Sequence, residues 1–175
     1  MQSDHSGAAK AASERLAAEL DVARRLEDLD VDTTATAAVS NIYRAAASVR
    51  RRGEREVLAP VNLTWGGFTI LWVLWIWGDM ETGQLAAECD LAKGTLSGML
   101  TTLEKRDLVQ RVPVAEDRRR VVVELLDAGR SLIEDVFPRF NSYETEVTSD
   151  LTEEEARELA RLLRKVITRS GPSSP

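Results

Sequence analysis

A run of ten residues, Phe68–Trp77 (FTILWVLWIW), carries no charged side chain and leaves this chain few ways to fold. Thr64 can cap a helix that begins at Trp65, and that helix would be apolar on almost every side. Such a helix is buried at the centre of a protein. Because a membrane span needs roughly 20 apolar residues, we expect a soluble protein with no membrane partner. The apolar positions of the helix are Trp65, Phe68, Ile70, Trp72, Val73, Leu74, Trp75 and Trp77.

The composition supplies a core for that helix and excludes several classes of protein. Of the 175 residues, 43% are hydrophobic and 30% are charged, which is typical of a globular domain. A single cysteine, Cys89, and the lack of a signal sequence predict a cytoplasmic protein. We expect Cys89 to pack as a small hydrophobe, and His5 and Cys89 do not make a metal site. No nucleophile–base set, carboxylate pair or phosphate loop is present, so we expect no metal, no cofactor and no enzyme activity.

Helical spacing predicts two helices before the central one, at about 8–29 and 34–52. The second ends in three arginines before Gly53. Basic side chains in a last turn favour the helix dipole, and glycine stops a helix. We therefore favour this structural role for the three arginines over contact with phosphate.

Two more helices are predicted at the C-terminal side. The first covers about 128–146 and should bend at Pro138. The second follows a capping box formed by Thr152 and Glu155. Its apolar stripe is Leu159, Leu162, Leu163 and Val166.

The segment between these outer helices has the pattern of a winged helix. Two short helices, at about 82–89 and 92–106, are joined by two residues and form a helix-turn-helix. The β-rich runs 108–114 and 121–125 follow, joined by the charged loop AEDRRR, which predicts a hairpin. The fold class is therefore mainly α with a small β-hairpin wing.

The second short helix presents a face that suits DNA. If its leucines point inward, the opposite face is small, polar and weakly charged. Hydroxyl and methyl groups can contact base edges, and glycine lets the backbone approach closely. Although the net charge is −6, the stretch 90–130 has eight basic side chains against seven acidic ones. The predicted contacts are Lys93, Gly94, Thr95, Ser97, Gly98, Thr101 and Thr102.

The stretch from Leu63 to Gly129 resembles the MarR family of bacterial winged-helix transcription regulators. The resemblance is carried by LTWGGFTILWVL, QLAAECDLAKGTLSGMLTTLEKRDLVQR and AEDRRRVVVELLDAG. Asp107 replaces a usual glycine and should adopt its left-handed conformation. The resemblance implies a homodimer in which the terminal helices of two copies interlock. The implied divisions are an extra helix and tail at 1–33, dimerisation helices at 34–62 and 127–169, a winged helix-turn-helix lobe at 63–126, and a tail at 170–175.

The resemblance also assigns roles within the hairpin. Asp117 and Arg119 match the family's D-x-R motif, in which Arg119 would enter the minor groove and Asp117 would hold the wing or the arginine. Arg118 and Arg120 should reach phosphates, or one of them should face back along the hairpin. The recognition helix 92–106 would lie in the major groove and the wing 114–121 in the minor groove.

Family members often bind a small aromatic or phenolic ligand between the dimer helices and the lobe. Tyr43, Arg44, Trp72 and Trp75 are the candidates for such a pocket, although core packing explains the tryptophans equally well. The expected function is a dimeric regulator, a repressor of genes preceded by a pseudo-palindromic double-stranded DNA operator. The alternative is a winged-helix protein-interaction module without operator binding.

Overall fold

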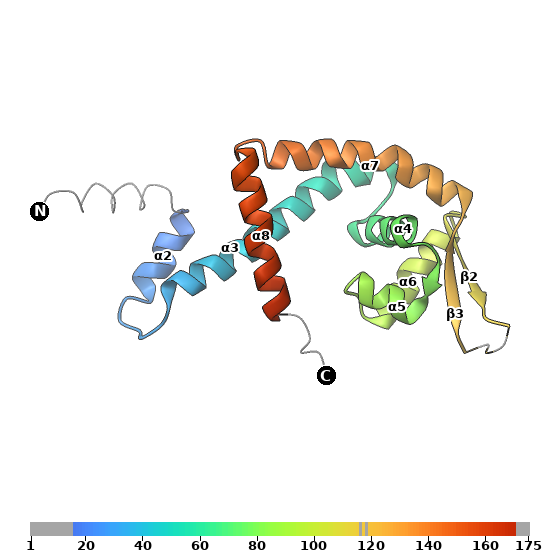
Figure 1. The fold of residues 1–175 in the computed structure, drawn as a ribbon, viewed down its shortest axis with the longest axis horizontal. Helices are drawn as coiled ribbons and strands as arrows, with labels where there is room; N and C mark the ends of the chain where they lie inside the picture. Colours follow the sequence, from blue (N-terminus) through green and yellow to red (C-terminus); the bar gives the residue numbers. More distant parts are fainter. Residues whose placement is uncertain (1–15, 116, 118, 171–175) are drawn as a thin grey trace, which may run out of the picture. The chain divides into compact units, whose positions relative to one another are not determined.

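The computed structural model describes residues 16–115, 117 and 119–170. Predictions for the tails at 1–15 and 171–175, and for Arg118, lie outside the described residues. The chain divides into two compact units, one ending at Ser48 and the next beginning at Val49. The helices are α2 (Ala17–Arg25), α3 (Thr33–Gly53), α4 (Trp65–Trp77), α5 (Thr82–Glu88), α6 (Lys93–Glu104), α7 (Asp127–Val147) and α8 (Glu153–Ser170), and the strands are β1 (Met80–Glu81), β2 (Val109–Pro113) and β3 (Val121–Leu125) (Figure 1).

The first unit contains α2 and most of α3. The helix predicted to reach residue 29 ends at Arg25, and a turn follows. The Asp32 carboxylate accepts a hydrogen bond from the Ala35 backbone N–H at 2.9 Å, which caps α3. Asn41 on α3 donates a side-chain hydrogen bond to Glu19 on α2. A polar contact thus joins the two helices.

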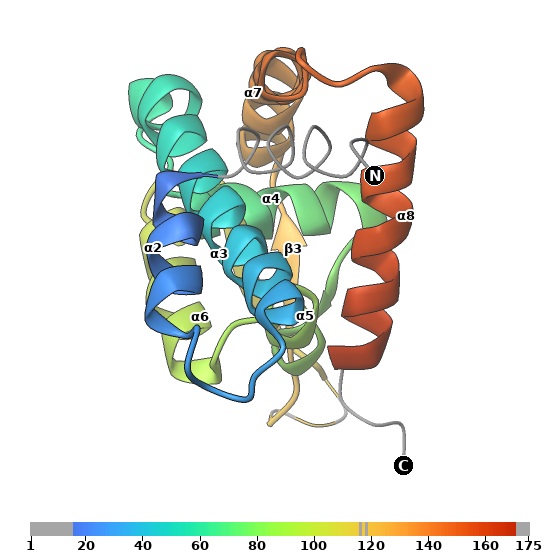
Figure 2. The same ribbon diagram turned by 90° about the vertical axis from the view of Figure 1, so that its left-hand side faces the viewer.

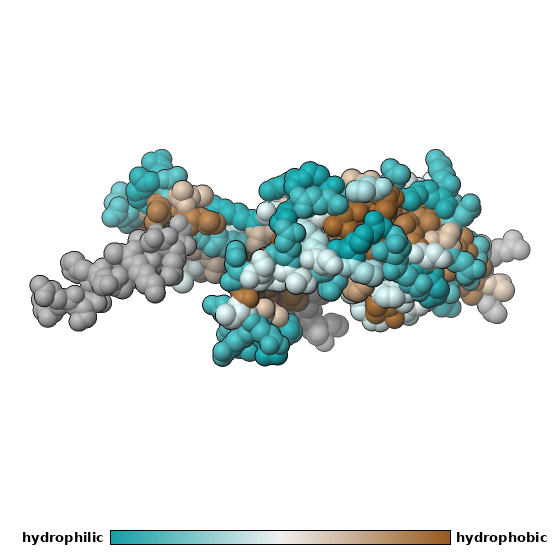
Figure 3. Space-filling view, turned by 90° about the horizontal axis from the view of Figure 1, so that it is seen from above, coloured by the Kyte–Doolittle hydropathy of each residue, from teal (hydrophilic) through white to brown (hydrophobic). Residues whose placement is uncertain are grey.

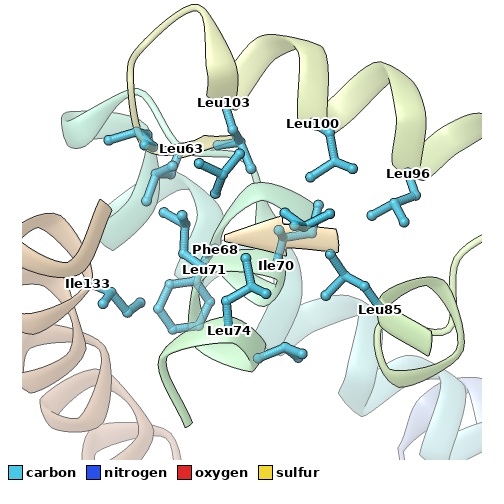
Figure 4. Packing of buried hydrophobic residues seen from close by; sticks show 14 of the residues in the cluster. Leu63, Phe68, Ile70, Leu71, Leu74, Leu85, Leu96, Leu100, Leu103 and Ile133 are labelled. Atoms are coloured by element: carbon cyan, nitrogen blue, oxygen red, sulfur yellow. The ribbon is translucent and has the colours of Figure 1, made fainter. Parts of the chain in front are cut away.

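In the second unit, α4 lies between α7 and the pair α5 and α6 (Figures 1 and 2). Its predicted bounds and cap are confirmed, because the Thr64 hydroxyl accepts from the Gly67 N–H at 3.1 Å. The helix is not enclosed on all sides, however. Ile76 and Trp77 are exposed at its C-terminal end, where α4 leaves the core. The buried hydrophobic residues of α4 are Phe68, Ile70, Leu71, Val73 and Leu74, which share one core cluster with leucines of α5 and α6 and with Ile133 of α7 (Figure 4).

Gly53 is the last residue of α3, but the chain stays helical beyond it. Its backbone is helical, with φ −60° and ψ −40°, and the chain continues through a π turn at Glu54–Leu58 and a 3-10 turn at Ala59–Val61. A Cβ at Gly53 would lie 2.9 Å from the ring of Tyr143 on α7. The glycine therefore allows α3 and α7 to pack closely. The prediction that Gly53 stops the helical course of the chain was wrong.

The predicted hairpin forms, but it belongs to a three-stranded antiparallel sheet of order β1-β3-β2. Strand β1 pairs Met80 with Val123 and Glu81 with Val122. The sequence analysis missed β1 because a strand of two residues shows no alternation. The Asp79 carboxylate accepts from the Leu125 N–H at 3.1 Å and fixes the same edge of β3.

The C-terminal helices follow the predicted pattern. Helix α7 continues through Pro138. The capping box before α8 is present, with the Glu155 N–H donating to the Thr152 hydroxyl at 3.2 Å and the Thr152 N–H donating to Glu155 at 2.8 Å. Helix α8 has no buried residue.

Apolar side chains reach the surface in several patches (Figure 3). On α8 the exposed members are Leu159, Leu162, Val166 and Ile167. Among the described helices, none alone is long and apolar enough to cross a membrane. The one pair that meets both criteria together, Thr33–Val61 with Trp65–Trp77, is bent by 77°.

Candidate nucleic-acid interface

The orientation of α6 is fixed by three leucines. Leu96, Leu100 and Leu103 are buried and point toward α4 and α5 (Figure 4). The turn before α6 is tight, with Asp90 at φ 51°. Because the leucines occupy one side of the helix, its other side faces solvent. All seven residues predicted for that side are exposed: Lys93, Gly94, Thr95, Ser97, Gly98, Thr101 and Thr102.

Two of the threonine hydroxyls on this face, those of Thr101 and Thr102, are engaged with the helix itself. The Thr101 hydroxyl donates to the Ser97 carbonyl at 3.0 Å, and the Thr102 hydroxyl donates to the Gly98 carbonyl at 3.2 Å. A threonine that bonds the carbonyl four residues earlier has its hydroxyl proton occupied. Both side chains therefore offer their methyl groups more readily than a proton.

Arg111 on β2 connects the hairpin to α6, a role that the sequence analysis missed. Its Nε donates to Glu104 at 3.0 Å, and its Nη2 donates to the Thr101 hydroxyl at 3.0 Å. The Arg111 hydrogen bonds hold the pKa of the Glu104 carboxyl below its ordinary value, despite the opposing effect of desolvation. This ion pair is partly buried, with 30% and 27% of the two side chains exposed. The wing is thus held at a set position beside the recognition helix.

Arg106 ties the end of α6 to the turn before α4. Its guanidinium donates to the carbonyls of Asn62 at 2.6 Å and Val61 at 3.1 Å. Asn62 has a left-handed backbone, with φ 55°. Asp107 has φ 53°, as its place after the recognition helix predicts. Sequence reasoning could not find the Arg106 contact because its partners lie more than 40 residues earlier.

The tip of the hairpin presents one arginine to solvent and turns another back. The Arg119 side chain is 93% exposed. The Asp117 carboxylate accepts from the Arg119 backbone N–H at 3.0 Å and from its Nε at 3.3 Å. Arg120 instead pairs with Glu81 on β1, with Nε 3.1 Å from the carboxylate, and this hydrogen bonding lowers the pKa of Glu81. Arg120 is therefore the arginine that faces back along the sheet.

The four ligand candidates are divided between the two units. Tyr43 is 72% exposed and Arg44 lines a cavity of about 120 Å³ between α2 and α3. The Arg44 Nη1 is buried without a hydrogen-bond partner among the described residues. In the second unit, Trp72 packs edge-on against Trp77, and the Trp75 indole N–H donates to Glu134 at 3.3 Å. The tryptophans thus have packing partners of their own.

Cys89 is half-buried beside the core. Desolvation, with a smaller effect from the Glu88 charge, raises the pKa of its thiol to about 11. A thiol with such a pKa is not a ready nucleophile, in keeping with its predicted role as a small hydrophobe. Within the described ranges there is no cluster of three or more metal-ligating side chains.

Comparisons with known proteins connect this geometry to a family. The profile of the MarR family matches residues 63–121. The HTH-type transcriptional regulator YwaE of Bacillus subtilis is 37% identical over 151 residues, covering 85% of this chain and 88% of YwaE. The HTH-type transcriptional regulator MgrA of Staphylococcus aureus is 32% identical over 129 residues, covering 73% of this chain and 85% of MgrA.

The fold has a solved counterpart in BpsR of Bordetella bronchiseptica, whose DNA binding is described as regulated by 6-hydroxynicotinic acid. The two structures align with a TM-score of 0.69 at 23% identity, over 74% of this chain and 97% of BpsR. Both YwaE and MgrA are named as HTH-type transcriptional regulators.

Proposed function

Because this chain belongs to the MarR family of DNA-binding transcriptional regulators, we propose that it binds a pseudo-palindromic operator as a homodimer and represses transcription. In this proposal α6 enters the major groove, and the hairpin tip, residues 114–121, enters the adjacent minor groove. Arg119 is the minor-groove residue, and Arg118 contacts a neighbouring phosphate. A narrow A·T minor groove has an enhanced negative potential that favours an inserted arginine.

The observation that carries the proposal is the exposed face of α6 beside an arginine-tipped hairpin. The face lies opposite three buried leucines, and Arg111 links it to the hairpin. Asp117 restrains Arg119 at both its backbone and its side chain. A restrained arginine loses less conformational entropy when it enters a groove. Lys93 at the start of α6 adds a positive charge where a phosphate would lie.

The homodimer is supported by apolar surface that this chain leaves uncovered. Helix α8 buries none of its residues, and four of its large apolar side chains are exposed. Exposed apolar patches of this kind mark interaction surfaces. We propose that residues 34–62 and 127–169 pair between two copies, which sets two α6 helices about one DNA turn apart, roughly 34–36 Å.

Selection of bound duplexes from a random pool tests the proposal directly. The parent chain should enrich a sequence with two related half-sites. The Arg119→Ala variant should bind that sequence more weakly by about 1–3 kcal/mol and unfold at an unchanged temperature. Arg24→Ala is the matched control, because Arg24 is an exposed arginine that pairs with Asp21 on α2, outside the proposed dimer helices and the hairpin. It should leave DNA affinity unchanged.

No enrichment by the parent chain, or equal binding by Arg119→Ala, would contradict operator recognition. Retention of a specific protein partner without DNA would then favour the interaction-module alternative. A winged helix that binds a protein partner would not need Arg119 to enter a DNA groove.

We also propose that a small aromatic or phenolic acid releases the operator. In the first unit, Arg44 offers a guanidinium nitrogen beside a cavity, without a hydrogen-bond partner among the described residues, and the neighbouring Tyr43 is exposed. Trp72 and Trp75, in the second unit, are candidates from the sequence alone. BpsR provides a precedent with an aromatic acid. Titration with 6-hydroxynicotinic acid and salicylate should quench tryptophan fluorescence and release DNA, and Arg44→Gln should abolish both effects. If neither compound changes fluorescence or DNA affinity, this class of ligand is excluded.

A further inference from the structure

The exposed face of α6 holds two glycines that the packing of this chain does not require. A Cβ added at Gly94 or Gly98 would meet no atom within 4 Å. By contrast, a Cβ at Gly66 would lie 2.7 Å from Met99, and one at Gly129 would lie 2.1 Å from the Leu108 carbonyl oxygen. Glycine is a poor residue for a helix interior, so Gly98 costs the free protein stability. We therefore infer that Gly98 serves the binding of a partner to this face.

The polar groups around these glycines are largely occupied within the protein. Arg106 is bonded to two carbonyls before α4, and Arg111 is bonded to Glu104 and Thr101. The hydroxyls of Thr101 and Thr102 donate to carbonyls of α6. Side chains that usually read bases do so by donating hydrogen bonds to guanine or by bidentate bonds to adenine. The part of this face that contains the glycines, Thr101 and Thr102 therefore retains few free donors for such contacts.

The start of this face keeps the polar groups of Lys93, Thr95 and Ser97. At the two glycines and at Thr101 and Thr102, the groups that remain available are methyl groups and bare backbone. Gly94 and Gly98 lie one turn apart on the helix, and Thr101 follows on the same side. Thymine is the only standard base that carries a methyl group in the major groove. A helix without side chains at two successive turns can approach that methyl group closely.

Building on the proposed function, we propose that α6 reads its operator mainly through thymine methyl groups. These pack against the backbone at Gly94 and Gly98 and against the methyl groups of Thr101 and Thr102. The helix-turn-helix brings α6 to the major groove. The glycines and the engaged hydrogen-bond donors then favour thymine methyl groups over other base edges. Operators of this protein should therefore carry thymines at fixed positions in each half-site.

Replacement of single thymines by deoxyuridine in the selected operator is the first test, because it removes only the methyl group. At one or more positions in each half-site, the affinity of the parent chain should fall about fourfold, the factor expected for one buried methyl group. The Thr102→Ser and Thr101→Ser variants remove the opposing methyl groups. One of them should bind the thymine operator more weakly and lose less on deoxyuridine substitution.

The Gly98→Ala variant gives the second test, because its effects on stability and binding should have opposite signs. The melting temperature should rise by about 2–4 °C, and affinity for the thymine operator should fall by about tenfold, as expected for overpacking. Deoxyuridine opposite residue 98 should restore much of that loss, because it vacates the space that the new methyl group fills. Gly83→Ala changes another open glycine, on α5, and should show no such recovery.

Two results would overturn the inference while leaving the operator proposal intact. One is an affinity for the selected operator that no deoxyuridine substitution changes. The other is a Gly98→Ala variant that binds this operator as tightly as the parent chain. A parent chain that enriches no duplex at all would instead refute the proposed function, and the inference with it.

Discussion

The charged residues of the hairpin form pairs with residues of α6, of β1 and of the hairpin itself. Arg111 bonds Glu104 and Thr101, Asp117 bonds Arg119, and Glu81 bonds Arg120. Each acid neutralises or orients one arginine, which leaves Arg119 as the most exposed cation of the described hairpin tip. An acidic chain can therefore present a local positive charge, because short-range pairing decides which cations face outward.

The Glu104–Arg111 pair should contribute to stability in a pH-dependent manner. The folded-state pKa of Glu104 lies below its ordinary value of about 4.3, so its contribution is present above that pH and is lost as the pH falls through the folded-state pKa. Glu104→Gln should lower the unfolding free energy by about 0.5–1 kcal/mol at pH 7. Urea unfolding of both proteins at pH 7 and pH 3 should show the difference narrowing in acid. A constant difference would mean that charge is not the cause.

Gly129 should be the least replaceable of the glycines discussed here. An added Cβ would approach the Leu108 carbonyl oxygen to 2.1 Å, and neither backbone can move freely. Gly129→Ala should therefore lower the unfolding free energy by about 2–3 kcal/mol, measured by chemical denaturation. Gly83→Ala adds the same atom into open space and should not lower the unfolding free energy. Equal stability of the two variants would contradict the packing described around α7.

Among the elements, the sequence best predicted those defined by periodic apolar residues. The bounds of α4 and β3 agree with expectation because an apolar run and a β-branched run are strong signals. Strand β1 and the turns at Glu54–Val61 were missed, since both depend on tertiary contacts rather than on local pattern. Arg106 and Arg111 were missed for the same reason. The exposed face of α6 was predictable because three leucines define the opposite side.

The cap of α4 offers a test at the level of one element. The Thr64 hydroxyl accepts from the Gly67 N–H at 3.1 Å at the start of the central helix. Thr64→Ala should lower the unfolding free energy by about 1 kcal/mol, whereas Thr64→Ser keeps the acceptor and should lose only a fraction of that. Thermal unfolding of the three proteins measures both effects. If the serine variant were as unstable as the alanine variant, the methyl group of Thr64 would contribute more to stability than the cap.

At the scale of the whole molecule, the proposed dimer depends on the uncovered side of α8. Leu162→Glu places a charge on that side and should raise the dimer dissociation constant by roughly 30-fold or more. Thr168→Glu is the matched control, because its hydroxyl bonds only the carbonyl of Arg164 within α8 in the described contacts. Sedimentation over a range of concentrations distinguishes the two. A Leu162→Glu variant that associates like the parent chain would remove α8 from the interface.

The central claim is that two copies of this chain bind one operator through α6 and the hairpin tip. Its most direct test is the binding stoichiometry of the parent chain on the selected duplex, measured by fluorescence anisotropy and by the mass of the complex. We predict saturation at two chains per duplex and an affinity that falls steeply as the salt concentration increases. A scrambled duplex should bind much more weakly. Saturation at one chain, or equal affinity for the scrambled duplex, would contradict the account.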